Sequence, residues 1–128
     1  IVRTAEAAGV DCIWLFKGCA DLYNPKVVRS TMGSLFRMPC RVGVEPELLL
    51  KYKEDGFRIT ATVLRDSVPL SEAEPCAKQI LVIGSEAAGI SDTVLSYADL
   101  RVRIPMEGKV ESLNAAVAAG IVMYWLKP

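Results

Sequence analysis

The sequence of 128 residues contains no histidine. A Ser-His-Asp triad, a histidine general base and a histidine metal ligand are therefore excluded within this chain. Any acid–base chemistry must use carboxylates, Lys, Arg, Tyr, Cys or the substrate itself. The four cysteines form no CxxC pair, so we expect no zinc site and no bound metal. We expect reduced, mostly buried thiols, as in a cytoplasmic protein.

Other patterns are missing as well. The longest uncharged apolar run, Leu113 to Leu126, is shorter than the roughly 20 residues of a membrane-spanning helix, so no membrane association is expected. The formal net charge is +0, so any attraction to nucleic acid must come from a local patch. The phosphate-binding strings GxxxxGK(S/T) and GxGxxG are both absent. Their absence disfavours ATP, dinucleotides and a flavodoxin-like nucleotide binder.

The segments that are present predict a single α/β domain over residues 1–128. A composition of 52% hydrophobic and 23% charged residues is typical of a globular protein. Helices are expected at residues 2–9, 27–36, 45–55, 91–98 and 112–127, and residues 65–69 are expected to form a turn. Strands are expected at residues 10–16, 40–44, 57–64, 80–83 and 100–104. This alternation predicts a mainly parallel sheet flanked by helices.

The stretch from Ile104 to Gly120 reads as strand, loop and helix, with Ser112 as the expected N-cap. Two further loops, at residues 62–66 and 84–89, also follow predicted strands. In a parallel sheet such loops share one edge and can form a single crevice. The glycines at positions 84 and 89 permit a tight turn there. The residues alone favour a nucleoside-containing cofactor held by backbone groups and an apolar wall.

Cations gather in the first part of the chain. Residues 22–44 contain four cations and no acid, and these are Lys26, Arg29, Arg37 and Arg41. This block fits either a solvated helix face or a patch that contacts phosphate. Arg3, in the first turn of the first predicted helix, is likewise either a solvated side chain or a group directed at an anion.

Four segments resemble motifs of the SpoU/TrmH family of RNA ribose 2′-O-methyltransferases, within the SPOUT superfamily. IVRTAEAAGVD at the N-terminus resembles the end of the first family motif, N-x-G-x-I-x-R-T-A. LVIGSEAAGIS, residues 81–91, resembles the second, and ADLRVRIPMEGKVESLNAAVAAG, residues 98–120, the third. VVRSTMGSLFRMP, residues 27–39, is similar to the R-x-S-x-G-x-L-F-x-x-P stretch of the family. Together the segments span essentially the whole chain.

The resemblance implies a SPOUT-type fold with a deep trefoil knot at the C-terminus, a homodimer and the cofactor S-adenosylmethionine. It implies methyl transfer to a ribose 2′-hydroxyl of rRNA or tRNA. It also implies cofactor contacts at Thr62, Val63, Leu64, Gly84, Glu86, Gly89, Ile104, Met106, Ser112 and Leu113. Catalytic roles fall on Arg3, Glu86, Ser112 and Asn114. If the cationic block is a patch that contacts phosphate, RNA contacts fall on Arg3, Lys26, Arg29, Arg37 and Arg41.

Two departures from the family pattern motivate an alternative. The asparagine and glycine of the first motif would precede Ile1, so we expect a longer protein. Ala87 stands where the second motif usually has glycine, and it must take a negative φ or accept strain. The alternative is a catalytically silent RNA- or cofactor-binding module. For Arg3, the roles of base and of positioning group stay open, as do the roles of Glu86 in orienting Arg3 or capping a helix.

Overall fold

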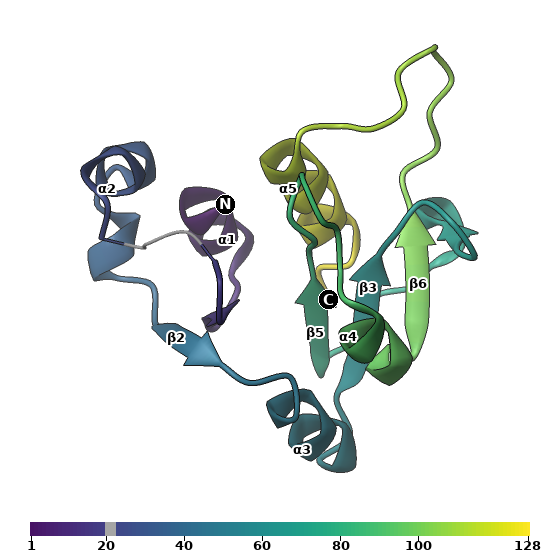
Figure 1. Cartoon of the computed structure of the whole chain (residues 1–128), viewed down its shortest axis with the longest axis horizontal. Helices are drawn as coiled ribbons and strands as arrows, with labels where there is room; N and C mark the ends of the chain where they lie inside the picture. Colours follow the sequence, from purple (N-terminus) through teal and green to yellow (C-terminus); the bar gives the residue numbers. More distant parts are fainter. Residues whose placement is uncertain (20–22) are drawn as a thin grey trace. The chain divides into compact units, whose positions relative to one another are not determined.

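The computed structural model describes residues 1–19 and 23–128, and the chain divides into two compact units, Ile1–Pro46 and Glu47–Pro128 (Figure 1). The first unit holds a two-stranded parallel sheet of β1 (Ile13–Phe16) and β2 (Cys40–Val44). Around it lie α1 (Val2–Ala8), α2 (Pro25–Thr31) and the 3-10 helix η1 (Ser34–Phe36). Gly9 ends α1 with a φ of 80°, as its position in the sequence predicts.

A continuous helix from Val27 to Phe36 was expected, and this expectation is wrong. The α2 helix stops at Thr31 because Met32 and Gly33 take left-handed conformations, with φ of 49° and 90°. The chain then re-enters a short 3-10 turn. Met32 and Phe36 are 68% and 80% exposed, so their helical spacing does not mark a buried face.

The second unit is built on a four-stranded parallel sheet with the order β4-β6-β3-β5. Its strands are β3 (Arg58–Thr62), β4 (Val68–Pro69), β5 (Gln79–Val82) and β6 (Leu100–Arg103). Its helices are α3 (Leu48–Glu54), η2 (Leu70–Glu72), α4 (Asp92–Tyr97) and α5 (Ala115–Trp125). The prediction of parallel strands alternating with helices is confirmed. The strand β4, which lies in the expected turn at residues 65–69, and the short helix η2 were not predicted. A two-residue strand that ends in proline has almost no sequence pattern, and it is tolerated here because β4 lies at the sheet edge.

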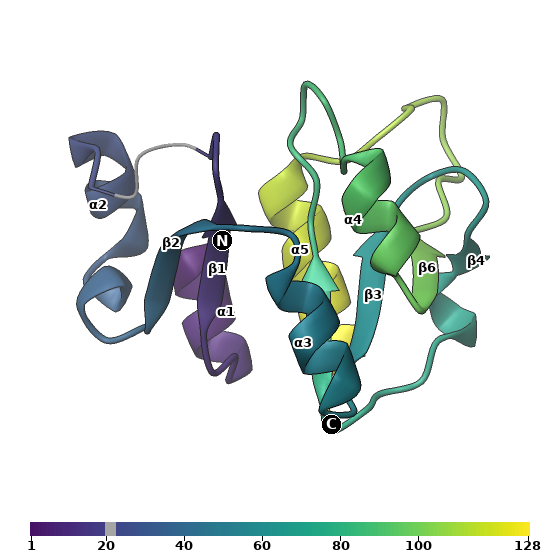
Figure 2. The ribbon, with the colours of Figure 1, turned by 60° about the horizontal axis from the view of Figure 1, so that its bottom comes forward.

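The residues of β6 alternate between the two faces of this sheet. Val102 is fully buried and belongs to a cluster with Val122 and Leu126 of α5. The neighbouring Arg101 points the other way and donates a hydrogen bond to the Leu95 carbonyl of α4 at 3.3 Å. The helices α4 and α5 therefore cover opposite faces of the sheet (Figure 2).

One face of α5 stays exposed. Ala119 and Val122 are buried, whereas Val117, Ile121 and Tyr124 are 53%, 41% and 53% exposed. These three residues follow the spacing of one helix face, so α5 carries a partly exposed apolar stripe.

The cysteine prediction is partly wrong. All four cysteines are free, yet Cys19 is exposed and the other three are only half-buried. Burial raises the pKa of the Cys40 thiol, with a smaller effect from Cys12. None of the helices in the described residues is long and apolar enough to cross a membrane.

Asp99 fastens α3 to the sheet. Its Oδ2 accepts a hydrogen bond from the Ile59 N–H at 2.8 Å, and its Oδ1 lies 2.9 Å from Lys53 Nζ. Burial raises the pKa of Asp99, but the Ile59 N–H and Lys53 outweigh it, and the net pKa is lowered. The ionised carboxylate is thus the form that the fold stabilises.

Asp99→Asn is expected to lower the free energy of unfolding at neutral pH by on the order of 1 kcal/mol, because one charge-assisted contact is lost. A lowered folded-state pKa contributes stability above the unfolded value of about 3.9, and this contribution is lost as the pH falls through the folded value. The stability difference between wild type and variant should therefore shrink between about pH 5 and pH 3 in urea titrations. A difference that does not change with pH would contradict this assignment.

Candidate functional site

Three loops meet at one edge of the larger sheet. The strands β3, β5 and β6 are parallel, so their carboxyl ends share an edge (Figure 1). The loops that leave this edge contain residues 63–67, 83–91 and 104–114, and they include every cofactor-binding residue predicted in the second and third motifs. A switch from strand to loop at the carboxyl edge of a parallel sheet is where α/β proteins bind ligands.

The 83–91 loop closes on itself at Gly84. Ser85 and Gly89 form an antiparallel bridge, with the Gly89 N–H donating to the Ser85 carbonyl at 2.9 Å. A Cβ atom at position 84 would lie 2.7 Å from the Gly89 carbonyl carbon and 2.9 Å from Ile90 N. Position 84 therefore requires glycine for steric reasons, since the atoms in contact are backbone.

The alanine that replaces the usual glycine in this loop causes no strain. Among the described residues, the non-glycine residues with positive φ are Met32 and Asp66, so Ala87 has a negative φ. The left-handed position of the turn is taken by Gly89, with a φ of 67°. The departure from the family pattern at Ala87 thus leaves the turn intact.

Glu86 joins this loop to the start of α5. Its Oε1 accepts hydrogen bonds from Asn114 Nδ2 at 3.1 Å and from the Ala115 N–H at 3.4 Å. A carboxylate at this position also interacts favourably with the helix dipole. The structure thus brings two residues of the predicted site, 28 positions apart, into contact, and it gives Glu86 the helix-capping role.

The N-cap of α5 is Asn114, and the prediction of Ser112 is wrong. Asn114 Oδ1 accepts from the N–H groups of Ala116 and Val117 at 2.9 and 3.3 Å, and the helix begins at Ala115. Ser112 is exposed and precedes the helix by three residues. Serine and asparagine are both good N-cap residues. The hydrogen bond from Asn114 to Glu86 favours Asn114 over Ser112.

Asn114→Ala is expected to destabilise the fold by about 1 kcal/mol through the lost cap, whereas Ser112→Ala should be close to neutral. Melting temperatures of the two variants check this directly. Equal melting temperatures, or a larger loss for Ser112→Ala, would contradict the assignment of the cap.

The remaining predicted cofactor residues are mostly half-buried at the same edge. Thr62 Oγ1 donates to the Val82 carbonyl at 3.1 Å, and the Val63 N–H donates to the Val102 carbonyl at 2.9 Å. Ile104 packs against the core, while Leu64 is 54% exposed. Met106 and Leu113 are half-buried in the third loop.

The predicted RNA-binding cations lie in the first unit. Lys26, Arg29 and Arg41 are exposed, and so is Arg3 on α1. Arg37 differs, because its Nε and Nη2 donate to the two carboxylate oxygens of Glu6 at 2.5 and 3.0 Å. A shallow hollow of this unit is lined by Arg3, Glu6, Ala7, Met32, Ser34 and Arg37.

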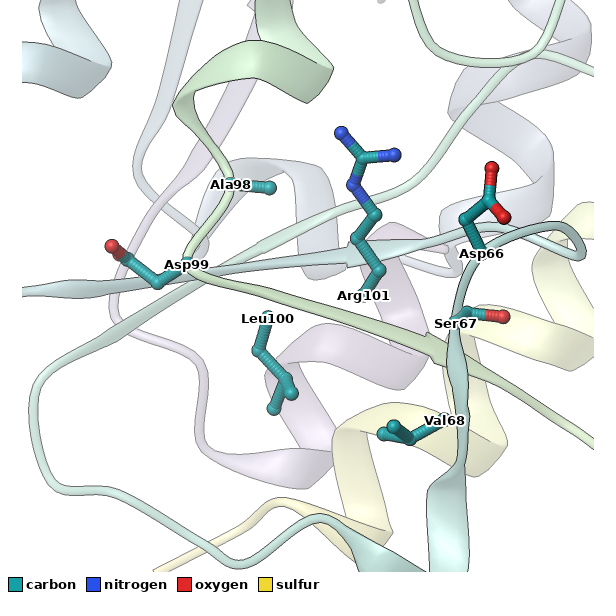
Figure 3. A pocket seen from close by; sticks show the side chains of 7 residues that line it. All are labelled: Asp66, Ser67, Val68, Ala98, Asp99, Leu100 and Arg101. Carbon is teal, nitrogen blue, oxygen red and sulfur yellow. The ribbon is translucent and has the colours of Figure 1, made fainter.

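A hollow lined by residues at the starts of β4 and β6 was not predicted. Its lining residues are Asp66, Ser67, Val68, Ala98, Asp99, Leu100 and Arg101 (Figure 3). Arg101 lines this hollow, whereas Arg103, at the next alternate position of β6, does not; each of the two arginines donates a hydrogen bond to a backbone carbonyl. These contacts make the arginines part of the fold. Among the described residues, no cluster of His, Cys, Asp or Glu could hold a metal ion.

Comparison with known proteins matches this architecture to one family. The model of the SpoU rRNA Methylase family matches residues 1–124. The 23S rRNA (guanosine(2553)-2'-O)-methyltransferase RlmP of Bacillus subtilis is 37% identical over 127 residues, which are 99% of this chain and 51% of that protein. An uncharacterized tRNA/rRNA methyltransferase of Synechocystis is 40% identical over 97% of this chain and 46% of its own length. The chain thus spans about half the length of these curated relatives.

The comparison with solved structures gives the same family as the comparison of sequences. The SpoU methyltransferase AviRb of Streptomyces viridochromogenes, crystallised in complex with the cofactor AdoMet, superposes with a TM-score of 0.90 at 32% identity, covering 98% of this chain and 52% of that one. An AdoMet-bound rRNA methyltransferase of Sinorhizobium meliloti gives a TM-score of 0.89 at 31% identity, covering 98% of this chain and 48% of that one. With its sequence and its parallel α/β architecture both matching, this chain belongs to the SpoU rRNA Methylase family.

Proposed function

We propose that this chain is the catalytic part of an enzyme that transfers a methyl group from S-adenosylmethionine to a ribose 2′-hydroxyl of rRNA or tRNA. The observation that carries the proposal is the convergence of three loops at one sheet edge, two of them joined by the contact between Glu86 and Asn114. The family match, the 2′-O-methyltransferase name of the Bacillus relative and the AdoMet-bound neighbours support it.

The loops fit a cofactor with a nucleoside and an amino-acid part. Gly84 lies so close to the backbone of Gly89 and Ile90 that no side chain fits between them, and the backbone of this turn faces the loop edge in the proposal. Ile104, Met106 and Leu113 provide half-buried apolar surface from the opposite loop. When bound, S-adenosylmethionine supplies a methyl group on a sulfonium. In this proposal the residues Thr62, Val63, Leu64, Gly84, Glu86, Gly89, Ile104, Met106, Ser112 and Leu113 hold it.

The chain must also activate the ribose hydroxyl, which is a poor nucleophile. Arg3, which matches the arginine of the first family motif, takes this task in the proposal. A guanidinium stays protonated in proteins, so Arg3 does not take the proton of the hydroxyl. It binds the RNA phosphate and donates a hydrogen bond to the 2′-oxygen, which stabilises the negative charge that develops there as the proton passes to solvent. The exposed Lys26, Arg29 and Arg41 bind neighbouring phosphates. Asn114 and Ser112 contribute polar groups from the third loop.

The test uses the full-length protein, labelled S-adenosylmethionine and RNA from cells that lack the gene. We expect label in a 2′-O-methylated nucleotide, and none in the same RNA carrying a 2′-deoxyribose at the target position. A protein that binds the cofactor in calorimetry yet labels no cellular RNA would overturn the proposal. Weak cofactor binding or none would instead favour the catalytically silent module.

The proposal includes the SPOUT-type trefoil knot at the C-terminus, a single catalytic domain over residues 1–128 and a homodimer. The exposed stripe of Val117, Ile121 and Tyr124 supports the dimer, because two such stripes can cover each other. Light scattering should give the mass of two chains at micromolar concentration. A monomer at that concentration would contradict the dimer while leaving the proposed reaction intact.

A further inference from the structure

Glu6, on α1, is bound by Arg37, the residue directly after the 3-10 turn η1. Arg37 binds both of its carboxylate oxygens, at 2.5 and 3.0 Å, which is the bidentate geometry of a strong charge-assisted pair. The guanidinium of Arg37, and after it the hydroxyl of the buried Ser34, lower the pKa of the Glu6 carboxyl. Glu6 is therefore an ionised side chain whose hydrogen bonds run to η1.

Arg3 lies three residues before Glu6 on the same helix. Opposite charges at this spacing share a helix face and lie within reach of each other. Here Arg3 Nη1 instead donates to the thioether sulfur of Met32 at 3.1 Å, and it forms no ion pair with any described residue. A thioether is neutral and a weak acceptor, so the charge of Arg3 stays uncompensated.

The break between α2 and η1 makes this arrangement possible. The left-handed residues Met32 and Gly33 turn the chain after Thr31, and the η1 turn that follows packs against α1. Arg37, directly after η1, then reaches Glu6, while Met32 reaches Arg3. In a helix that continued through Phe36, the helical period would set the directions of Met32 and Arg37. The left-handed residues Met32 and Gly33 redirect the backbone instead, and both side chains reach α1.

We propose that Arg37 is a positioning residue that holds Glu6 away from Arg3 and so leaves Arg3 able to bind an RNA anion. This inference rests on the proposed function, in which Arg3 contacts the RNA. It gives Arg37 a role other than the phosphate contact expected from its place in the cationic block. Without Arg37, the carboxylate of Glu6 would pair with Arg3 and repel the phosphate.

The experiment compares Arg37→Met, Glu6→Gln and the double variant in the full-length protein. We expect Arg37→Met to lower kcat/KM for RNA methylation about fivefold. In this variant Glu6 would pair with Arg3 on the same helix, and its carboxylate would repel the RNA phosphate. Glu6→Gln removes the competing charge and should stay close to wild type. The double variant should recover most of the lost kcat/KM, and cofactor affinity should not change in any variant.

A purely structural role of the ion pair makes a different prediction. The pair is absent in Arg37→Met and in the double variant alike, so both would be impaired equally and their melting temperatures would fall together. That result would overturn the proposal. Arg37→Lys, which keeps a cation near Glu6, should retain more activity than Arg37→Met if the proposal holds.

A second readout does not depend on activity. In NMR spectra of the arginine side chains, Arg37→Met should shift the Arg3 Nε–H resonance through pairing with Glu6, and the double variant should restore it. An Arg3 resonance unchanged by Arg37→Met would overturn the inference. If this shift and its reversal occur but the wild-type protein methylates no RNA, the proposed reaction fails and the role of Arg37 stands.

Discussion

Gly84→Ala should weaken the binding of S-adenosylmethionine by roughly 30-fold, corresponding to about 2 kcal/mol of overpacking. The added Cβ would lie 2.7 Å from the carbonyl carbon of Gly89 and 2.9 Å from its Cα. These are backbone atoms closed by the bridge between Ser85 and Gly89, so the clash cannot be relieved by a side-chain rotation. The loop has to open, which displaces the backbone groups proposed to hold the cofactor. Calorimetry measures the affinity.

Gly108→Ala is the matched control for this prediction. Gly108 lies in the loop at residues 104–114, where an added Cβ meets no heavy atom within 4 Å and the φ is not left-handed. The same chemical change there should leave the cofactor affinity within about twofold, because no contact is strained. If both variants bind equally well, the steric role of Gly84 is wrong. If both variants bind the cofactor poorly, the mobility of the glycine loops, rather than the clash at position 84, controls the cofactor affinity.

Arg3→Ala should reduce methyl transfer by about 100-fold or more, because the proposed function assigns to Arg3 the charged donor at the ribose hydroxyl. Cofactor affinity should be unchanged, since the residues proposed to hold the cofactor lie in the three loops of the second unit. Arg3 is exposed on α1, so the loss is not expected to come from unfolding. Turnover with labelled cofactor, and the melting temperature in parallel, separate the two effects.

Arg41→Ala is the comparison variant, in which only a proposed phosphate contact is lost. Arg41 is exposed on β2, and the proposal assigns it only a phosphate contact. Its loss should raise KM for RNA and reduce the salt dependence of binding, with kcat nearly unchanged. An Arg3→Ala variant that behaves in the same way would show that Arg3 binds RNA without activating the hydroxyl. Wild-type turnover in Arg3→Ala would contradict any role for it in the reaction.

The sequence predicted the elements whose periodicity is local. The apolar run at residues 80–83 and the strand predicted at residues 100–104 correspond to β5 and β6. The helix predicted at residues 91–98 corresponds to α4, which Ser91 caps by accepting from the Val94 N–H. The three motif loops follow from the strands, because parallel strands place their carboxyl ends together. Fold class and the general position of the site were therefore predictable.

The predictions that were wrong concern features that depend on contacts between residues distant in sequence or on a local backbone conformation. Ser112 and Asn114 have similar cap propensities, and Glu86, far away in sequence, selects Asn114. The apolar spacing from Val27 to Phe36 was helical, but the left-handed backbone at Met32 ended the helix. The pairing of Arg37 with Glu6 could not be read from a block of cations, because the acid lies on another element.

The carboxylate of Glu86 has a consequence for the motions of the site. It bonds the Ala115 N–H, which is one of the amides that an α-helix leaves without an internal partner at its first turn. If the loop at residues 83–91 moved away from α5, this amide would lose its protein acceptor and would meet solvent. The hydrogen-exchange rate of the Ala115 amide therefore measures how often the loop opens, and a ligand that closes the loop should slow that exchange.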